Sequence, residues 1–479
     1  MRCKYILLLL LSVNFFITVK ASGLPTLSEK DDPPNVLFIT IDDLRNDLGA
    51  LGVDHIQTPN LDAFAEQGRL FSRHYVQVPT CGSSRAALMR GMRADMPVYL
   101  PNTAIADTHE DWGDRSLPAW FRQHGYQTLS LGKITHYPGG LTGESWAEGP
   151  EELPGAWDRS WIPESPWETP EDMMHGFANG QPRDRGTSPT WESHNGPDTS
   201  YPDSWVASEA IDVLDELSQD DDPWFFAVGF FKPHLPFAAP KKYFDLYDQV
   251  QIPAPEDTAK QPSPSSWHGS GEMMGNYGQH PGDPRTDKDY ANQLRHAYAA
   301  ATSYVDAQVG RLLDSIGQSN LDENTIIVIW GDHGFALGEQ GIWGKHSLYE
   351  VGLKAPLIIR YPGMNNPGQP SNAIVETVDL FPTLTDLTNL PTPEGLHGES
   401  LREQLEDYQA SSNKAAYAHW NRGQTTVRDE NWRLIEHRAD DEVQGYELFD
   451  FRGNNDGQRR DAGNHPDVVK ELLRKLAIQ

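Results

Sequence analysis

The strongest constraint on the fold is a short apolar segment that recurs along the chain and ends each time in polar residues. The first occupies residues 35–41 and is followed by Asp42 and Asp43. It lacks the alternation of a half-exposed strand, so it fits a strand buried on both faces of a parallel sheet. Helical patterns at 205–217 and 290–313 separate such segments, which predicts an α/β fold with a large, mostly parallel sheet flanked by helices. The other apolar segments lie at 127–131, 224–229, 325–330 and 356–359.

The rest of the chain divides into two kinds of region. Residues 138–202 and 253–284 are rich in Pro and Gly with little periodicity, and they are either walls of a substrate cleft or ordinary surface insertions. After residue 400, short apolar runs at 415–419, 432–435 and 446–449 precede a helical pattern at 466–477. We therefore predict a catalytic domain over 35–400 and a smaller C-terminal α+β subdomain over 401–479, with a short antiparallel sheet.

A shorter helix is expected at residue 59, where Pro59 follows Thr58 as the capping residue and Gly68 ends the pattern.

The N-terminus has the pattern of a secretory signal. Arg2 and Lys4 precede an apolar run over 6–13, and the small residues Ala21 and Ser22 follow it. We predict a signal peptide over 1–21, a linker over 22–34 and an exported protein, periplasmic or secreted; an uncleaved anchor is the alternative. The later sequence contains no apolar stretch that predicts a membrane span in the mature chain.

The charge of the chain limits its partners. The formal net charge is −30 over 479 residues, which argues against nucleic acid as a partner because that binding needs a basic surface. An anionic substrate would have to be held by a local cationic pocket. The simplest reading of the acidity is solubility.

Cysteine use draws attention to one position. Cys3 lies in the predicted signal, so Cys81 is left alone and no disulfide can form within the mature chain. A buried, inert thiol is one reading. The other follows from its surroundings, because a helix is predicted to open just after Cys81 and Arg85 lies one turn on. A helix N-terminus with a nearby cation favours an anionic nucleophile or an anionic ligand.

Polar side chains follow several of the predicted strands. Ligands bind at the carboxyl edge of open α/β sheets, so these side chains should converge there. Three carboxylates and one imidazole favour a hard cation such as calcium or magnesium over zinc. An ordinary helix cap is the alternative for the aspartate pair. The side chains in question are Asp42, Asp43, Lys133, His234, Asp332 and His333.

At this point the sequence resembles a known family. The segment CGSSR at 81–85, with Gly91 downstream, is similar to the Cys-x-Pro-x-Arg signature of type I sulfatases, with Ser83 where the family usually has Pro or Ala. A Lys-Pro-His segment at 232–234 resembles the iduronate-2-sulfatase-like branch. The remaining motifs of the resemblance are 35–43, Gly132-Lys133 with His136, 331–334, 337–339, 343–345 and 377–383.

The resemblance implies an alkaline-phosphatase-like fold and the hydrolysis of a sulfate ester, in a sulfated polysaccharide or its oligosaccharides. It implies that a formylglycine-generating maturation enzyme oxidises Cys81 to formylglycine, whose hydrated form attacks sulfur. In this scheme Arg85 steadies the diol, His234 protonates the leaving alcohol and His136 helps release sulfate. The implied ligands of one Ca²⁺ are Asp42, Asp43, Asp332, His333 and the matured Cys81, while Lys133 and Lys345 neutralise the sulfate oxygens.

Several alternatives stay open. One alternative to a sulfatase is a phosphoester or phosphonate hydrolase of the same superfamily. Another is a carbohydrate-binding pseudoenzyme whose Cys81 stays unmodified. His346 either touches substrate or has a structural role. Tryptophans in the first insertion either stack on sugar rings or pack that segment onto the body; they are Trp146, Trp157, Trp161, Trp167 and Trp191.

Overall fold

The computed structural model of the chain describes residues 33–137, 151–412, 414–420, 423–440, 442–453 and 457–477. Residues 33–479 form one compact unit. The predicted signal peptide and all but the last two residues of the predicted linker lie outside the described residues. None of the helices in the described part of the chain combines the length and the apolar character needed to cross a bilayer.

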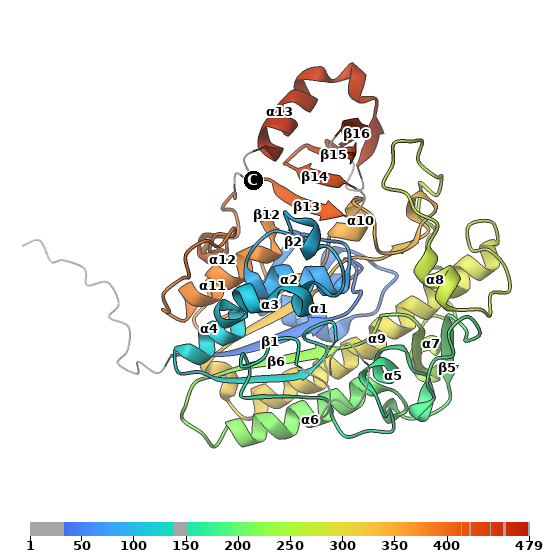
Figure 1. The fold of residues 1–479 in the computed structure, drawn as a ribbon. Coiled ribbons are helices and arrows are strands. Elements are labelled where there is room, and N and C mark those ends of the chain that lie inside the picture. The colour runs from blue at the N-terminus through green and yellow to red at the C-terminus, as the bar shows by residue number, and fades with distance from the viewer. Residues whose placement is uncertain are drawn as a thin grey trace, which may run out of the picture. The chain divides into compact units, whose positions relative to one another are not determined.

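An eight-stranded sheet runs through the centre of the main body (Figure 1). Strand β11 is antiparallel to both of its neighbours, and the other neighbouring strands are parallel. The prediction of a mostly parallel sheet is thus confirmed. The order across the sheet is β12 (Ser371–Glu376), β2 (Arg69–Tyr75), β11 (Leu357–Arg360), β8 (Thr325–Gly331), β1 (Asn35–Ile41), β6 (Trp224–Phe230), β3 (Gln127–Gly132) and β4 (Arg159–Trp161).

Helices cover both faces of this sheet, which explains the continuous apolar run of β1. Val36 and Phe38 point into one core, shared with α2 (Cys81–Arg90) and α11 (Leu380–Leu387). The alternate residues of β1 enter a second core on the opposite face. That core is closed by α6 (Pro202–Leu217) and α9 (Lys288–Gln318), which pack against each other. These two helices confirm the helical patterns of the sequence.

The short helix α1 (Pro59–Ala65) also forms where expected, with Thr58 at its N-cap. The Thr58 hydroxyl does not cap the helix, however. It accepts a hydrogen bond from Gly49 N at 3.0 Å and donates to Asp62 Oδ1 at 3.1 Å. Thr58 is therefore the capping residue by position, as predicted, while its side chain ties the helix to the preceding loop.

The C-terminal region forms a second, antiparallel sheet, as the sequence predicted. Its strands follow chain order: β13 (Ala416–Trp420), β14 (Gln424–Arg428), β15 (Trp432–Ala439), β16 (Glu442–Asp450) and β17 (Gln458–Arg460). Helix α13 (Pro466–Leu476) packs against β14 and β15. The backbone N–H of His419 donates to the carbonyl of Gln77 and joins this sheet to the main body. The boundary at residue 400 stays a prediction.

Both irregular insertions contain defined structure. The first holds α5 (Pro170–His175) and β5 (Trp191–His194), and β5 pairs with β7 (Phe237–Pro240). The second holds α8 (Gly271–Asn276). Residues from 170–185 of the first segment and from 271–276 of the second line a cavity beside the polar side chains at the carboxyl edge of the central sheet.

Candidate active site

Neighbouring parallel strands bring the predicted polar side chains to one edge of the sheet. Asp42 follows β1, Lys133 follows β3 and Asp332 follows β8. Lys133 Nζ lies 2.7 Å from Asp42 Oδ2, although the two residues come from different strands. Asp43 N donates a hydrogen bond to Asp332 Oδ1 at 2.9 Å. The expected convergence of these side chains is therefore present in the structure.

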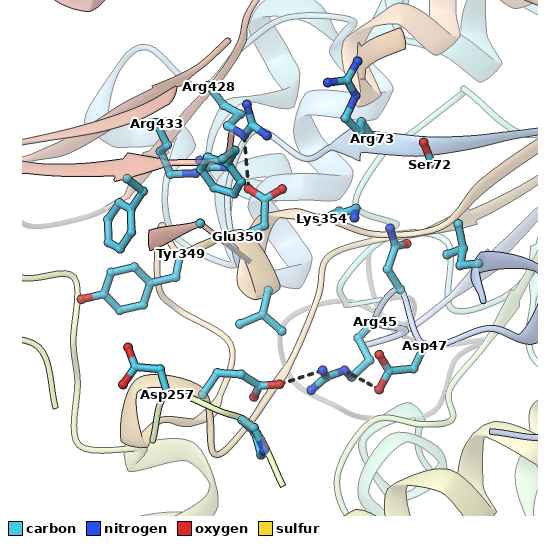
Figure 2. A pocket seen from close by; sticks show the side chains of 18 of the residues that line it. Arg45, Asp47, Ser72, Arg73, Asp257, Tyr349, Glu350, Lys354, Arg428 and Arg433 are labelled. Carbon is cyan, nitrogen blue, oxygen red and sulfur yellow. Dashed lines mark hydrogen bonds and ion pairs between the residues drawn. The ribbon is translucent and has the colours of Figure 1, made fainter. Parts of the chain in front are cut away.

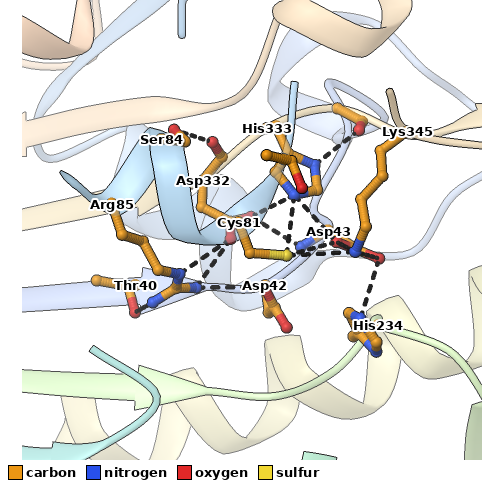
Figure 3. Close-up of polar contacts among 12 residues, drawn as sticks. Thr40, Asp42, Asp43, Cys81, Ser84, Arg85, His234, Asp332, His333 and Lys345 are labelled. Carbon is orange, nitrogen blue, oxygen red and sulfur yellow. Dashed lines mark hydrogen bonds and ion pairs between the residues drawn. The ribbon is translucent and has the colours of Figure 1, made fainter. Parts of the chain in front are cut away.

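Arg85, at the left in Figure 3, joins the two aspartate segments. Its Nη2 atom lies 3.3 Å from Asp42 Oδ1 and 3.0 Å from Asp332 Oδ2, and all three side chains are fully buried. The guanidinium also donates to the carbonyls of Lys133 and Ile134. A buried charge is tolerated only when it is paired in this way. Arg85 thus links the segments that follow β1, β3 and β8 at the site.

Cys81 lies at the first position of α2, so the helix begins at the cysteine itself and not after it. Its Sγ atom lies 3.2 Å from His333 Nε2, 3.2 Å from Lys345 Nζ and 3.7 Å from Asp43 Oδ1. Burial raises the pKa of the thiol well above its usual value, and the charge of Asp42 adds to this effect. The unmodified thiol is therefore poorly suited to act as an anionic nucleophile.

Around Cys81 two overlapping groups of side chains have the composition of a metal site. Their ligand atoms lie within 4.8 Å of one another: Asp42, Asp43, Cys81 and His234 in one group, and Asp42, Cys81, Asp332 and His333 in the other. Three of the six donors are carboxylate oxygens, those of Asp42, Asp43 and Asp332, and such oxygens favour a hard cation.

The backbone around the aspartate pair supports that reading. Asp43 has a φ of 60°, and no helix begins at the pair, so the helix-cap alternative is excluded. Burial would raise the pKa of Asp42, but the charges of Lys133, His234 and Arg85 outweigh it and hold that pKa well below its usual value. Asp42 is therefore an anion ready to hold a cation.

Glu272 belongs to this cluster and was missed by the sequence analysis. Its Oε1 atom lies 3.1 Å from Lys345 Nζ and 3.5 Å from His234 Nε2. Burial would raise the pKa of Glu272, but Lys345 and His234 hold it well below the usual value. It sits on α8, inside the second insertion, and only its place in a predicted cleft wall could have pointed to it.

His136 and His346 lie at the margin of the cluster. The His136 ring packs edge-on against Tyr137 with centroids 4.4 Å apart. Burial, with the charge of Lys133, lowers the pKa of His136 well below the usual value. His346 contacts Thr80 and stacks on Trp420 at 5.1 Å, and burial lowers its pKa to about 3. Both histidines are thus neutral near pH 7 and line the same cavity.

A cavity of about 550 Å³ opens above these groups. Both irregular insertions line it, as expected for walls of a cleft. Trp157, Trp161, Trp167 and Trp191 do not. The rings of Trp157, Trp161 and Trp191 pack against Phe225, Phe226 and Phe244, and the buried Trp167 donates from Nε1 to the carbonyl of Phe177 at 3.1 Å, which favours the packing alternative. Trp146 lies outside the described residues. The polar lining consists of Asn102, Lys133, His136, Tyr137, Glu171, His175, Arg183, Arg185, His234, Glu272, Asn276, Lys345 and His346.

A second cavity, of about 730 Å³, is larger but holds none of the predicted site residues (Figure 2). Arg45 pairs there with Asp47 and Glu339, and Arg433 pairs with Glu350. Since these charges largely satisfy each other, the smaller cavity is the better candidate for chemistry.

The fold and the site together define an enzyme of the alkaline-phosphatase-like class. The family model for sulfatases matches residues 34–390, and the model for the C-terminal region of N-sulphoglucosamine sulphohydrolase matches residues 338–478. The chain therefore belongs to the sulfatase family and is a sulfatase.

Individual relatives agree with that assignment. The chain is 29% identical to a sulfatase of Formosa agariphila, over 91% of this chain and 85% of the relative. It is 31% identical to human iduronate 2-sulfatase, over 76% of this chain and 70% of the relative. Among solved structures it resembles the phosphonate monoester hydrolase of Agrobacterium radiobacter, with a TM-score of 0.75 and 22% identity over 93% of this chain and 95% of that one. At that identity the likeness shows the fold alone.

Proposed function

We propose that this sulfatase removes sulfate from a sulfated polysaccharide or its oligosaccharides, through a formylglycine made from Cys81. The observation that carries the proposal is the position of the Cys81 Sγ atom, which lies 3.2 Å from both Lys345 Nζ and His333 Nε2. Sγ marks the place that an oxygen of the matured residue would take. A nucleophile at this position would lie between the ammonium group of Lys345 and the carboxylate of Asp43.

The donor set fits one Ca²⁺, which would be held by Asp42, Asp43, Asp332, His333 and the matured Cys81. A bound cation would polarise the sulfate and favour the ionised form of the nucleophile. His333 is oriented for this role, because its Nδ1 donates to the carbonyl of Gly334 at 2.9 Å and leaves Nε2 facing the cluster. Such a second bond commonly fixes the orientation of a ligating histidine.

The protein's other side chains have separate roles in the proposed reaction. Lys133 and Lys345 neutralise the sulfate oxygens as charge shifts during displacement. His234 donates from Nδ1 to the carbonyl of Leu235 at 2.7 Å, so Nε2 is the atom that can pass a proton to the leaving alcohol. His136, whose Nδ1 has no hydrogen-bond partner among the described residues, takes a proton as sulfate leaves.

The relatives support the substrate class, and the N-terminal sequence supports the location. Human iduronate 2-sulfatase is named for a sugar acid, and we infer that this chain belongs to the same branch. We also infer that the chain is exported, given the signal pattern over 1–21, and that a formylglycine-generating enzyme of its host matures Cys81.

The test is mass spectrometry of the Cys81 peptide from the native host, together with an assay for sulfate release. Conversion exchanges the thiol sulfur and two hydrogens for one oxygen, so the mature peptide has a defined lower mass. Only intact thiol, with no sulfate released from any sulfated sugar, would refute the proposal. That result would leave the carbohydrate-binding pseudoenzyme.

Phosphonate or phosphate ester hydrolysis is the second candidate, because the chain shares its fold with a phosphonate monoester hydrolase. Turnover of an aryl sulfate, an aryl phosphate and an aryl phosphonate on one preparation separates the two. We expect the aryl sulfate to be preferred, and a higher kcat/KM for either phosphorus ester would reverse the assignment.

A further inference from the structure

Two arginines in the wall of the active-site cavity share a single carboxylate. Arg183 Nη2 and Arg185 Nη2 each lie 3.1 Å from the same atom, Glu171 Oε1. Among the described residues, neither arginine has a second ion-pair partner. The trio therefore carries one positive charge in excess, and all three residues line the cavity.

The excess charge is partly buried. The Arg183 side chain is 4% exposed, whereas its partner Glu171 is 49% exposed. The buried ring of Tyr277 lies under the Arg183 guanidinium, 5.6 Å from its carbon. Burying a cation that shares its counter-ion is costly unless a further anion completes the pairing. This arrangement is typical of a site that binds an anionic ligand.

The arginines are also held in position before any ligand arrives. Gly186 N donates to the carbonyl of Asn276, and Gly278 N donates to the carbonyl of Ser188, each at 3.0 Å. A Cβ atom on Gly278 would lie 1.7 Å from the carbonyl oxygen of Gly186, so only glycine allows this approach. The arginine segment is thereby fixed against the second insertion, which lowers the cost of ordering it on binding.

This group is distinct from the two lysines at the base of the cavity. Lys133 and Lys345 are engaged by the carboxylates of Asp42 and Asp43 and serve the cleaved sulfate. The arginine pair comes from another part of the chain. The protein has a net charge of −30, so it can hold an anion only where cations are concentrated locally. The arginine pair is a second such group.

We propose that Arg183 and Arg185 bind a second anionic group of the substrate, a carboxylate or a further sulfate on the same or the adjoining sugar. The planar guanidinium matches the paired oxygens of either group. This inference rests on the proposed function and narrows it, because it requires substrates that carry two anions. Glu171 competes with the ligand for the arginines.

Equilibrium binding to the Cys81→Ala chain tests the proposal without any need for turnover. Calorimetry would compare hexose monosulfates with the matching hexuronic acid monosulfates and the matching disulfates. Each pair differs only in the added anion, and the two arms distinguish a carboxylate from a sulfate. We expect the doubly anionic member of at least one pair to bind about tenfold more tightly than its singly anionic match, as for a charge-assisted hydrogen bond.

Two further changes in the same chain should move that ratio in opposite directions. Arg185, whose side chain is 67% exposed, can be changed with little risk to folding, and Arg185→Met should lower the ratio several-fold. Glu171→Gln removes the competing carboxylate and should raise it. Arg115→Met is the matched control, since Arg115 is 62% exposed and also pairs with a neighbouring acid; it should leave the ratio unchanged.

The outcomes separate this proposal from the proposed function. Equal affinities within every pair, no measurable binding of the doubly anionic members, or a ratio unaffected by Arg185→Met would overturn the second-anion site, even if sulfate is released normally. Selective binding in these pairs supports the site, even if the unmutated chain releases no sulfate and the proposed function fails.

Discussion

The Nζ atom of Lys345 lies 3.2 Å from the Sγ atom of Cys81, although 264 residues separate them in the sequence. The contact depends on a short hairpin after His333. Strand β9 (Ala336–Leu337) pairs with β10 (Trp343–Gly344) and returns the chain to the edge of the central sheet. Lys345, which directly follows β10, thus brings a cation to the nucleophile position.

Lys345→Ala should lower kcat/KM for a sulfated substrate by about 100-fold or more, because it removes a preorganised cation from the sulfate site. Steady-state kinetics and a thermal melt would be measured together. Lys242→Ala is the control, since Lys242 is 60% exposed on the surface, and its kinetics should be unchanged. A near-normal rate for Lys345→Ala in a folded chain would remove this residue from the site.

A calcium-selective chelator should inactivate the enzyme and lower its melting temperature. Without a cation, three buried carboxylates, those of Asp42, Asp43 and Asp332, lose a counter-ion, and any ligand of the folded state stabilises it by mass action. Added Ca²⁺ should restore both activity and melting temperature. Full activity after chelation, with metal shown to be absent by elemental analysis, would refute the assigned ligands.

Glu152 should make stability depend on pH. Its burial raises the pKa of the carboxyl from 4.5 to about 7. The folded chain binds this proton more tightly than the unfolded chain, so the stability it contributes is full below about pH 4.5 and is lost as the pH rises through 7. A shift of that size corresponds to about 3 kcal/mol.

Glu152→Gln mimics the protonated side chain and should therefore raise the free energy of unfolding at pH 8, with a smaller effect at pH 5. Denaturant unfolding at both values would measure the difference. Glu151→Gln, at the exposed neighbouring position, should show no such pH dependence. An equal effect of Glu152→Gln at both pH values would contradict the raised pKa.

Gly82→Ala should destabilise the chain and displace the nucleophile. A Cβ atom at residue 82 would lie 2.2 Å from the carbonyl oxygen of Asn102, and Asn102 Oδ1 also accepts a hydrogen bond from Gly82 N at 2.9 Å. Overpacking of this kind costs about 1–3 kcal/mol, and the shift would move the adjacent Cys81.

Thermal melts and the kinetics of sulfate release would measure both effects. Gly317→Ala is the control, because a Cβ atom there meets nothing within 4 Å and lies in a helix, where alanine is favoured over glycine. It should be neutral or stabilising. Normal stability and activity of Gly82→Ala would contradict the prediction and show that the Asn102 backbone can move to accommodate the added Cβ atom.

The parts of the fold that the sequence predicted are those with a regular local pattern. Strands β1, β6 and β8 are buried on both faces and therefore read as continuous apolar runs. Strand β2 was missed because Arg69 and Arg73 interrupt its pattern. In the structure the Arg69 side chain is buried and donates to the carbonyls of Gln404 and Leu405, and a contact across that many residues leaves no local signal.

The same limit applies to the site. The residues that follow predicted strands were placed correctly, because strand direction alone brings their side chains to one edge. Glu272, Arg183 and Arg185 lie in insertions without periodicity, so nothing in their immediate sequence placed them near the cavity. Their positions depend on contacts between the two insertions, such as those of Gly186 and Gly278.

The sequence by itself determined the alternation of strands and helices, the polar residues at the strand ends and the motif around Cys81. Each of these features depends on residues that are close along the chain. Only the tertiary structure decided which cations surround Cys81, that Glu272 joins them, and that Arg183 and Arg185 share one carboxylate in the cavity wall. Those relationships arise from packing between distant segments, where distance in space bears no relation to distance in sequence.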